Sequence, residues 1–206
     1  MKLEYLNSAQ AAVLRSWWQA LQPQAESHGK TGPFAMLGRA DRAKLRRCAE
    51  PEAVVMQPAF QRLVFLLDQE EVRKEHSRFA GDYLAYAVVA GILSHVKTDA
   101  GDGKSFAESM GTPFENNGNK GKAPLSELRF QRLQTCANEV DFYRQAIRSV
   151  KLLRGNADVA STADDLLAWV RECRRGHATQ QPRDSLKFRW ANDYYRQALQ
   201  LTATAK

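Results

Sequence analysis

The stretch GRADRAKLRRCAEPEAVVMQPAFQRLV, from Gly38 to Val64, decides how the N-terminal half of the chain folds. Its first part predicts a helix over Arg39 to Ala49, because apolar residues recur there at helical spacing. Pro51 cannot continue this helix, and Pro58 suits the first turn of a second, apolar helix. The stretch therefore predicts a short basic helix, a sharp corner and a buried helix. The residues that we expect on the core-facing side of the basic helix are Leu37, Ala40, Leu45 and Cys48.

Basic side chains lie on a different face of this first helix. Arg39, Arg42 and Arg46 share that face, and Lys44 and Arg47 flank it. A basic helix face is usually no more than a solvated surface. The whole chain has 30 basic and 23 acidic residues and a formal net charge of +7. This mild excess suggests a polyanionic partner without establishing one.

Length and composition indicate a folded protein of one or two domains. The chain has 206 residues, of which 44% are apolar, so it can bury a real core. Its three cysteines, Cys48, Cys136 and Cys173, have neither disulfide-framework nor zinc spacing, and we expect them reduced in the core. The N-terminus lacks the apolar run of a signal peptide, and no stretch approaches the roughly 20 apolar residues of a membrane span. We expect a cytoplasmic protein with no membrane partner.

The rest of the pattern predicts an all-α fold, with two small helical bundles joined by a Gly/Asn-rich linker. Tyr83 to Val96 is apolar on most sides, which is typical of a helix at the centre of a bundle. The glycine-rich segment after it, with the run ENNGNKGK, indicates a linker with at most one helical turn at Ser105 to Met110. Four amphipathic helices follow. The expected units are an N-terminal bundle over 1–97, a flexible linker or insert over 98–123 and a C-terminal bundle over 124–206.

The C-terminal bundle also has basic helix faces. One is a pair of arginines one helical turn apart. The other is a row of basic residues on the side of the next helix opposite its apolar side. Positive charge spaced in this way can follow a phosphate chain. Three nearby carboxylates, those of Glu127, Glu139 and Asp141, can equally neutralise part of it, so a salt-bridged surface is an alternative of the same weight. The basic residues are Arg129 and Arg132 in the pair, and Arg144, Arg148, Lys151 and Arg154 in the row.

No pattern of residues indicates an enzyme, a metal or a cofactor. The segment DAGDGKS, Asp99 to Ser105, lacks the strand–loop–helix context of a phosphate-binding loop. Asp164 and Asp165 fall in the first turn of a helix that Thr162 is expected to cap, where carboxylates suit the helix dipole. The histidines have no metal-site spacing; they are His28, His76, His95 and His177.

Aromatic side chains can act as platforms for stacked bases. Trp169, Trp190 and Tyr194 fall on apolar helix stripes, so we expect them in the core. Tyr195 lies off the stripe, and for this residue base stacking stays open.

The two halves together resemble one known family. The pattern R-A-x-L-R-R-x-x-E-P followed by P-A-F-x-R-L-V is similar to the N-terminal half of the CasB family, the small subunit of the type I-E CRISPR Cascade complex. The strings LRFQRL, IRSVKLL, DDLLAWV and RWANDYYR then appear in the order and rough spacing of that family. The resemblance covers residues 38–96 and 124–198, and the Gly/Asn-rich insert between them departs from it.

The resemblance implies a non-catalytic subunit without a cofactor. Two copies would lie side by side along the crRNA-bearing backbone of Cascade, in contact with the backbone and large subunits. Their implied task is to hold the displaced strand of the target DNA, and modest contacts suffice because R-loop formation is nearly balanced in free energy. The residues that the matching motifs assign to nucleic-acid contact are Arg46, Arg47, Arg129, Arg132, Arg148 and Lys151, with Arg39, Arg42 and Arg154 ranked below them.

Three other functions compete with this interpretation: a DNA-binding regulator, a structural assembly subunit and a hydrolase, the last of which would show metal or nucleotide dependence in an activity screen. A free-standing helical DNA-binding regulator would need a recognition helix that reads base edges, usually in a dimer. A purely structural assembly subunit would bind protein neighbours without contacting nucleic acid. Sequence preference in DNA binding by the isolated chain would favour the first, and the absence of salt-dependent DNA affinity would favour the second.

Overall fold

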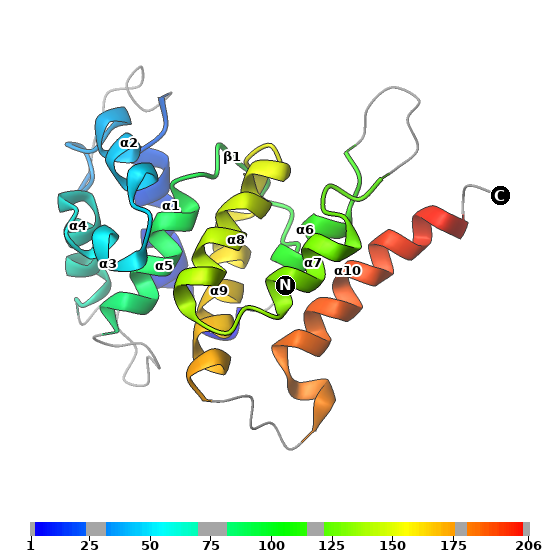
Figure 1. The fold of residues 1–206 in the computed structure, drawn as a ribbon. Helices are drawn as coiled ribbons and strands as arrows, with labels where there is room; N and C mark the ends of the chain where they lie inside the picture. Colours follow the sequence, from blue (N-terminus) through cyan, green and yellow to red (C-terminus); the bar gives the residue numbers. More distant parts are fainter. Residues whose placement is uncertain (1–2, 24–31, 70–81, 115–121, 176–180, 204–206) are drawn as a thin grey trace.

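The computed structural model describes residues 3–23, 32–69, 82–114, 122–175 and 181–203 (Figure 1). The chain is all-α within these ranges, as predicted, apart from one pair of two-residue strands. His28, His76 and His177 lie outside the described residues. The helices are α1 (Ser8–Ala20), α2 (Arg39–Arg47), α3 (Pro51–Val55), α4 (Pro58–Leu67), α5 (Tyr83–Leu93), α6 (Phe106–Gly111), α7 (Glu127–Gln134), α8 (Glu139–Leu152), α9 (Val159–Arg174), the 3₁₀ helix η2 (Pro182–Asp184) and α10 (Leu186–Ala203).

The corner predicted after the basic helix is confirmed, with one addition. Helix α2 ends at Arg47, and Pro58 opens α4 at a position where proline has no amide hydrogen to lose. Between them Pro51 opens a further short helix, α3, which the sequence pattern did not predict. Five residues are too short a window for helical periodicity to show.

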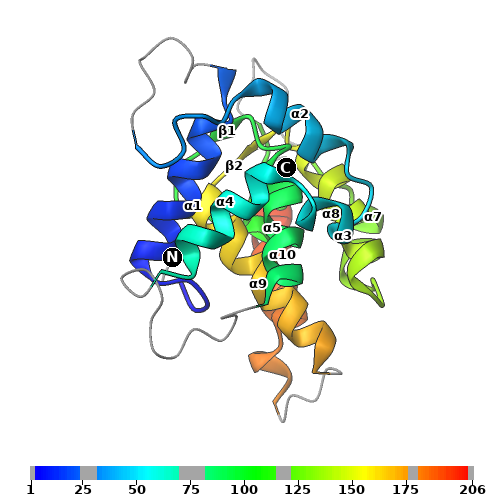
Figure 2. The same ribbon diagram turned by 90° about the vertical axis from the view of Figure 1, so that its left-hand side faces the viewer.

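Helix α5 is the centre of the molecule (Figure 2). Nine of its residues, Ala85 to Leu93, are buried. The helix contacts α2, α3 and α4 of the N-terminal half and α8 and α9 of the C-terminal half. Burial on all sides explains why its sequence is apolar on all sides.

Both adjacent tryptophans of the first helix, α1, lie in the core. Trp17 donates its indole N–H to the carbonyl of Ala59 at 2.9 Å, and Trp18 donates to the carbonyl of Val96 at 3.1 Å. Both side chains are almost fully buried, although adjacent residues of a helix point to different sides. Helix α1 contacts α4 and α9, and two neighbours allow adjacent residues both to be covered.

Helix α9 begins one turn earlier than predicted. Its cap is Asp158, whose carboxylate accepts from the amide of Ser161 at 2.8 Å, and not Thr162. Asp164 and Asp165 therefore lie in the second turn and are buried. The carboxylate of Asp164 accepts the amides of residues 4, 5 and 6, which fastens the N-terminal segment to α9.

The described part of the glycine-rich segment is packed into the fold. Residues 98–99 form β1 (Thr98–Asp99), which pairs in parallel with β2 (Asn156–Ala157). The predicted helical turn is α6, capped by Ser105, and its side chains Phe106 and Met110 are fully buried. Helix α6 lies against α10. Residues 98–114 are thus a fixed part of the structure, and 115–121 lie outside the described residues.

Several contacts cross the boundary drawn between the two predicted bundles. Tyr143 of α8 donates its hydroxyl to the carbonyl of Cys48 at 3.1 Å, and Arg144 forms an ion pair with Glu50 at 3.6 Å. Buried residues of both halves form one hydrophobic cluster. The division into 1–97 and 124–206 stays a prediction about independent folding, and these contacts argue against it.

Candidate nucleic-acid interface

Arg42 is part of the core and not of a ligand surface. Its Nε donates to the carbonyl of Ser94 at 2.9 Å and its Nη2 to the carbonyl of Val96 at 2.7 Å. Ser94 is the C-cap of α5, where helix carbonyls lack partners and a positive charge is favourable. The side chain is 9% exposed. Of the nine residues assigned to nucleic-acid contact, we therefore remove Arg42.

Helix geometry explains this correction. Arg42 precedes the fully buried Leu45 by three positions, and such neighbours lie on the same side of a helix. Ala40 precedes Leu45 by five positions, which turns it away from the core, and it is exposed. The sequence therefore contained a signal that Arg42 and not Ala40 belongs to the core-facing side.

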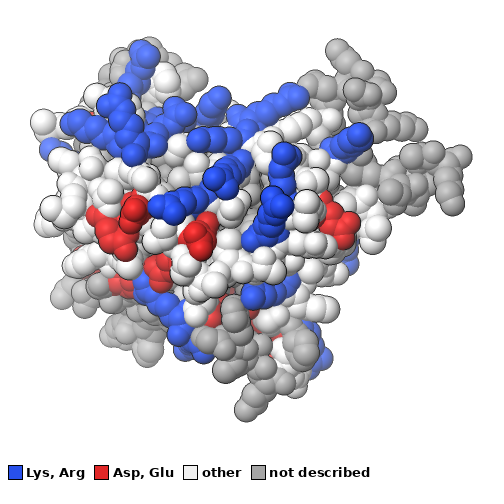
Figure 3. Space-filling view, viewed as in Figure 1, with Lys and Arg blue, Asp and Glu red and all other residues white. Residues whose placement is uncertain are grey.

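The eight remaining candidates are exposed, and the tertiary structure draws several of them together. The C-terminal end of α2 lies against α8 through the Tyr143–Cys48 hydrogen bond. The segment after α5 joins the end of α8, where the amide of Lys97 donates to the carbonyl of Gly155 at 2.7 Å. Figure 3 shows basic side chains gathered over α2 and over the C-terminal end of α8. We call the exposed side chains of this region the basic face: Arg39, Arg46, Lys97, Arg148, Lys151 and Arg154.

His95 lies where the two basic helices meet, which the sequence did not indicate. Its pKa is lowered to about 4, first by burial and then by the positive charges of Arg46, Lys151 and Arg42. Arg46 and Arg42 come from α2, and Lys151 comes from α8. The electrostatic influence of these residues on one ring means that positive charge from both halves of the chain converges here.

The carboxylates expected to neutralise the C-terminal basic residues have other partners. Glu139 binds Arg174, with Oε1 2.5 Å from Nε. Glu127 accepts from Gln131 at 3.1 Å and from Tyr195 at 2.9 Å. In the described ranges none of seven candidates forms an ion pair: Arg39, Arg46, Arg47, Arg129, Arg132, Arg148 and Lys151.

Arg154 occupies a position that glycine usually takes. It follows the end of α8 with φ of 58°, and its amide donates to the carbonyl of Lys151 while that of Gly155 donates to Val150. This pair of bonds is the Schellman arrangement, whose left-handed residue costs about 1–2 kcal/mol when it is not glycine. The guanidinium lies 4.5 Å from the centre of the Phe114 ring. Arg154 therefore places a positive charge at a position where the left-handed backbone conformation favours glycine.

Arg47, Arg129 and Arg132 are exposed, but no contact among the described residues ties them to the basic face. Arg129 and Arg132 belong to α7, which packs on α8. Tyr195, the aromatic residue left open, is half-buried, with its ring edge against Phe130 and its hydroxyl bound to Glu127. It therefore packs within the fold.

The described residues include no group of three or more His, Cys, Asp or Glu side chains that could hold a metal ion. No helix among them is long and apolar enough to cross a membrane. In the segment resembling a phosphate loop, the amide of Gly103 donates to Asp158 at 3.0 Å and Ser105 caps α6. These groups are thus engaged within the protein.

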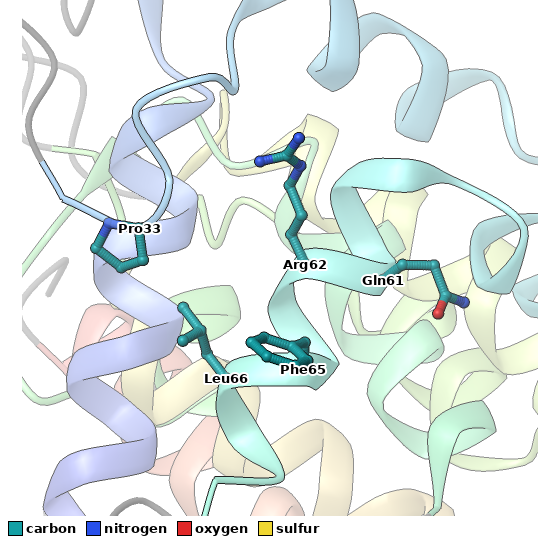
Figure 4. Close-up of a pocket in the computed structure, with 5 residues that line it drawn as sticks. All are labelled: Pro33, Gln61, Arg62, Phe65 and Leu66. Atoms are coloured by element: carbon teal, nitrogen blue, oxygen red, sulfur yellow. The ribbon is translucent and has the colours of Figure 1, made fainter.

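An apolar groove lies on a different surface, beside α4. It has a volume of about 410 Å³. Pro33, Phe65 and Leu66 lie side by side in it, while Gln61 and Arg62 point away from them (Figure 4). Phe65 is 68% exposed and lies on the outer side of α4, whereas Phe60 and Leu63 of the same helix are fully buried.

Comparison with known proteins identifies the family. Searches of curated proteins and of solved structures gave no match. The model of the family described as CRISPR-associated protein Cse2 matches residues 41–195, well over half of the chain. This range includes α3 to α9 completely and most of α2 and α10. The chain therefore belongs to the CRISPR-associated protein Cse2 family, which is the CasB family of Cascade small subunits that its sequence resembles.

Proposed function

We propose that this subunit of a Cascade complex holds the displaced, non-target strand of the target DNA through its basic face and so stabilises the R-loop. The observation that carries the proposal is the gathering of exposed basic side chains over α2 and over the C-terminal end of α8, which come from the two halves of the chain (Figure 3). Unpaired cations that meet in one place attract a polyanion, and a single strand presents one phosphate per nucleotide.

The energy required of such a subunit is small. The RNA–DNA hybrid formed in an R-loop is about as stable as the DNA duplex that it replaces. A few phosphate contacts then shift the balance, which agrees with a net charge of only +7. In this role the chain would act in the cytoplasm and without catalysis, beside crRNA, the backbone and large subunits and a second copy of itself.

The test is binding of target DNA by reconstituted Cascade, with and without this chain, across a salt series. We expect omission to weaken R-loop retention and to flatten the salt dependence, by about 0.7 in log–log slope for each single-strand phosphate that is no longer neutralised. The double substitution R148A/K151A should reproduce part of this effect while the subunit still assembles. Unchanged affinity and slope after omission would contradict the proposal.

Arg144→Ala is the matched control for these substitutions. Arg144 is on the same helix and is also exposed, but its charge is paired with Glu50 at 3.6 Å. Surface ion pairs of this kind contribute about 0–1 kcal/mol to stability, so the variant should fold. We expect its salt slope to match that of the unsubstituted complex. An equal reduction of the slope in R144A and in R148A/K151A would show a non-specific charge effect.

A second candidate, an assembly role without nucleic-acid contact, is favoured by the groove beside α4. Its exposed Phe65 offers a neighbouring subunit an aromatic anchor of the kind common at interfaces. In this case Phe65→Ser should reduce incorporation into Cascade, and charge substitutions on the basic face should leave R-loop retention unchanged. The two roles are therefore separated by which variants fail, and at which step.

A further inference from the structure

His95 is a buried side chain without an evident structural purpose. It follows Ser94, the C-cap of α5, and is 6% exposed. Neither ring nitrogen has a hydrogen-bond partner in the described structure. An unpaired buried donor or acceptor costs about 1–3 kcal/mol, and most such groups in folded proteins are paired. A phenylalanine or leucine would fill the same space without this cost.

The surroundings of the ring are basic. On one side, Arg42 donates hydrogen bonds to the carbonyls of Ser94 and Val96, the residues before and after His95. Arg42 and Arg46 both belong to α2. On the other side, the backbone of Lys97 is bound to Gly155, immediately beyond α8, which brings Lys151 near. The charged groups that act on the ring are Arg46, Lys151 and Arg42, and no carboxylate acts with them.

Such an arrangement is suited to a phosphate group. Arg46 and Lys151 are exposed on long side chains, so they can turn toward a ligand at the surface. A neutral imidazole has one N–H donor and one acceptor, and a protonated imidazole has two donors. In the free protein burial, and then the neighbouring cations, oppose protonation of His95 and lower its pKa. A phosphate bound between them offsets their charge and so favours the protonated imidazole.

We propose that a phosphate of the bound nucleic-acid strand lies between Arg46 and Lys151 next to His95, and that the imidazole takes up one proton from solvent as the phosphate binds. This inference rests on the proposed function and specifies its chemistry at one point of the basic face. The covalent bonds of the strand are unchanged, and the proton returns to solvent on release. Strand binding by this subunit is then stronger in mildly acidic solution.

The direction and window of the effect follow from linkage. In the free protein the pKa of His95 is about 4. If the bound phosphate restores it to at least the ordinary value of about 6.5, the affinity rises by about tenfold as the pH falls from about 7.5 to about 5.5. Arginine and lysine keep their charge over this range, so the effect belongs to a histidine or to a carboxyl group of raised pKa.

The experiment measures binding of a fluorescent single-stranded DNA oligonucleotide of mixed sequence to the full chain by anisotropy at these two pH values and constant ionic strength. We expect the tenfold gain for the unsubstituted chain and none for His95→Gln. Asp165→Asn is the matched control, because the pKa of Asp165 is also in this region, about 7, but it lies on α9 away from the basic face. We expect D165N to keep the gain.

Calorimetry gives a readout that needs no substitution. Binding enthalpies in buffers of different ionisation enthalpy report the protons taken up, which we expect to be about 0.7 per bound strand near pH 6. No proton uptake, an equal pH gain in H95Q, or no DNA binding by the chain at either pH would overturn the inference. None of these results decides the strand-holding role, which the salt series on complete Cascade tests separately.

Discussion

At the scale of single residues, Arg42 is a structural cation within a basic helix. Burial, and then the charge of Arg46, lower its pKa, yet its two hydrogen bonds hold the end of α5. We expect Arg42→Met to cost about 1–3 kcal/mol of unfolding free energy, because two buried carbonyls lose their donor. Chemical denaturation measures this. Arg46→Met, one turn away and exposed, should stay within about 0.5 kcal/mol of the unsubstituted protein, and equal destabilisation would contradict the assignment.

The buried His95 makes stability depend on pH. Its folded pKa of about 4 is below that of an unfolded histidine, so the unfolded state binds more protons between the two values. Stability is therefore full above about pH 6.5 and falls by about 3 kcal/mol as the pH drops to about 4. Urea unfolding at a series of pH values measures this slope, which His95→Gln should remove. A slope unchanged in H95Q would show that another group is responsible.

Asp165 acts in the opposite sense. Burial, with the charges of Asp164 and Asp193, raises its pKa to about 7, although the amide of Phe106 donates to it at 2.7 Å. A carboxyl group whose folded pKa is raised stabilises the fold at low pH, and this contribution is lost as the pH rises through about 7. Asp165→Asn should therefore lessen the loss of stability that accompanies a rise in pH from about 4 to about 7, and because the effect of His95 over this range has the opposite sign, the same urea series separates the two groups.

At the scale of elements, the contact between α5 and α8 depends on a glycine. A Cβ atom at Gly91 would lie 2.3 Å from the hydroxyl oxygen of Tyr143, whose ring is fully buried and bound to Cys48. We expect Gly91→Ala to be destabilising, because overpacking costs about 1–3 kcal/mol and exceeds the gain of about 1 kcal/mol from helix propensity. Denaturant unfolding measures the net change.

The double variant G91A/Y143L tests the cause. If the tyrosine ring is what the new methyl group meets, Gly91→Ala should cost less in the Tyr143→Leu background than in the unsubstituted protein. Equal costs in both backgrounds would place the strain elsewhere.

Local patterns account for most of the elements. Proline positions and apolar spacing predicted α2, the corner and α4, and uniform apolarity predicted the burial of α5. The elements that the sequence pattern did not predict are very short, or they lie in a segment whose glycine content suggests a linker. Helix α3 and the strands β1 and β2 have too few residues for periodicity, and the glycines around α6 hid the packing of this helix into the core.

At the scale of the whole molecule, the N-terminal segment, α1 and α5 all contact helices of the C-terminal half. We expect one cooperative unfolding transition, with equal calorimetric and van't Hoff enthalpies, because the two halves share a core. Differential scanning calorimetry of the full chain tests this. Two separate transitions would instead support the division into bundles at 1–97 and 124–206.

The sequence by itself determined the all-α class, the placement of most helices, the mild basic excess and the family resemblance, because these depend on local spacing, composition and ordered motifs. Only the tertiary structure decided which cations are available. It buried Arg42, joined the C-cap of α2 to α8 and buried His95 between the two carbonyls that Arg42 binds. The contact that joins α2 to α8 links residues 95 positions apart in the sequence, Cys48 and Tyr143. Helical periodicity extends over single elements, so it cannot show which basic faces of different helices meet.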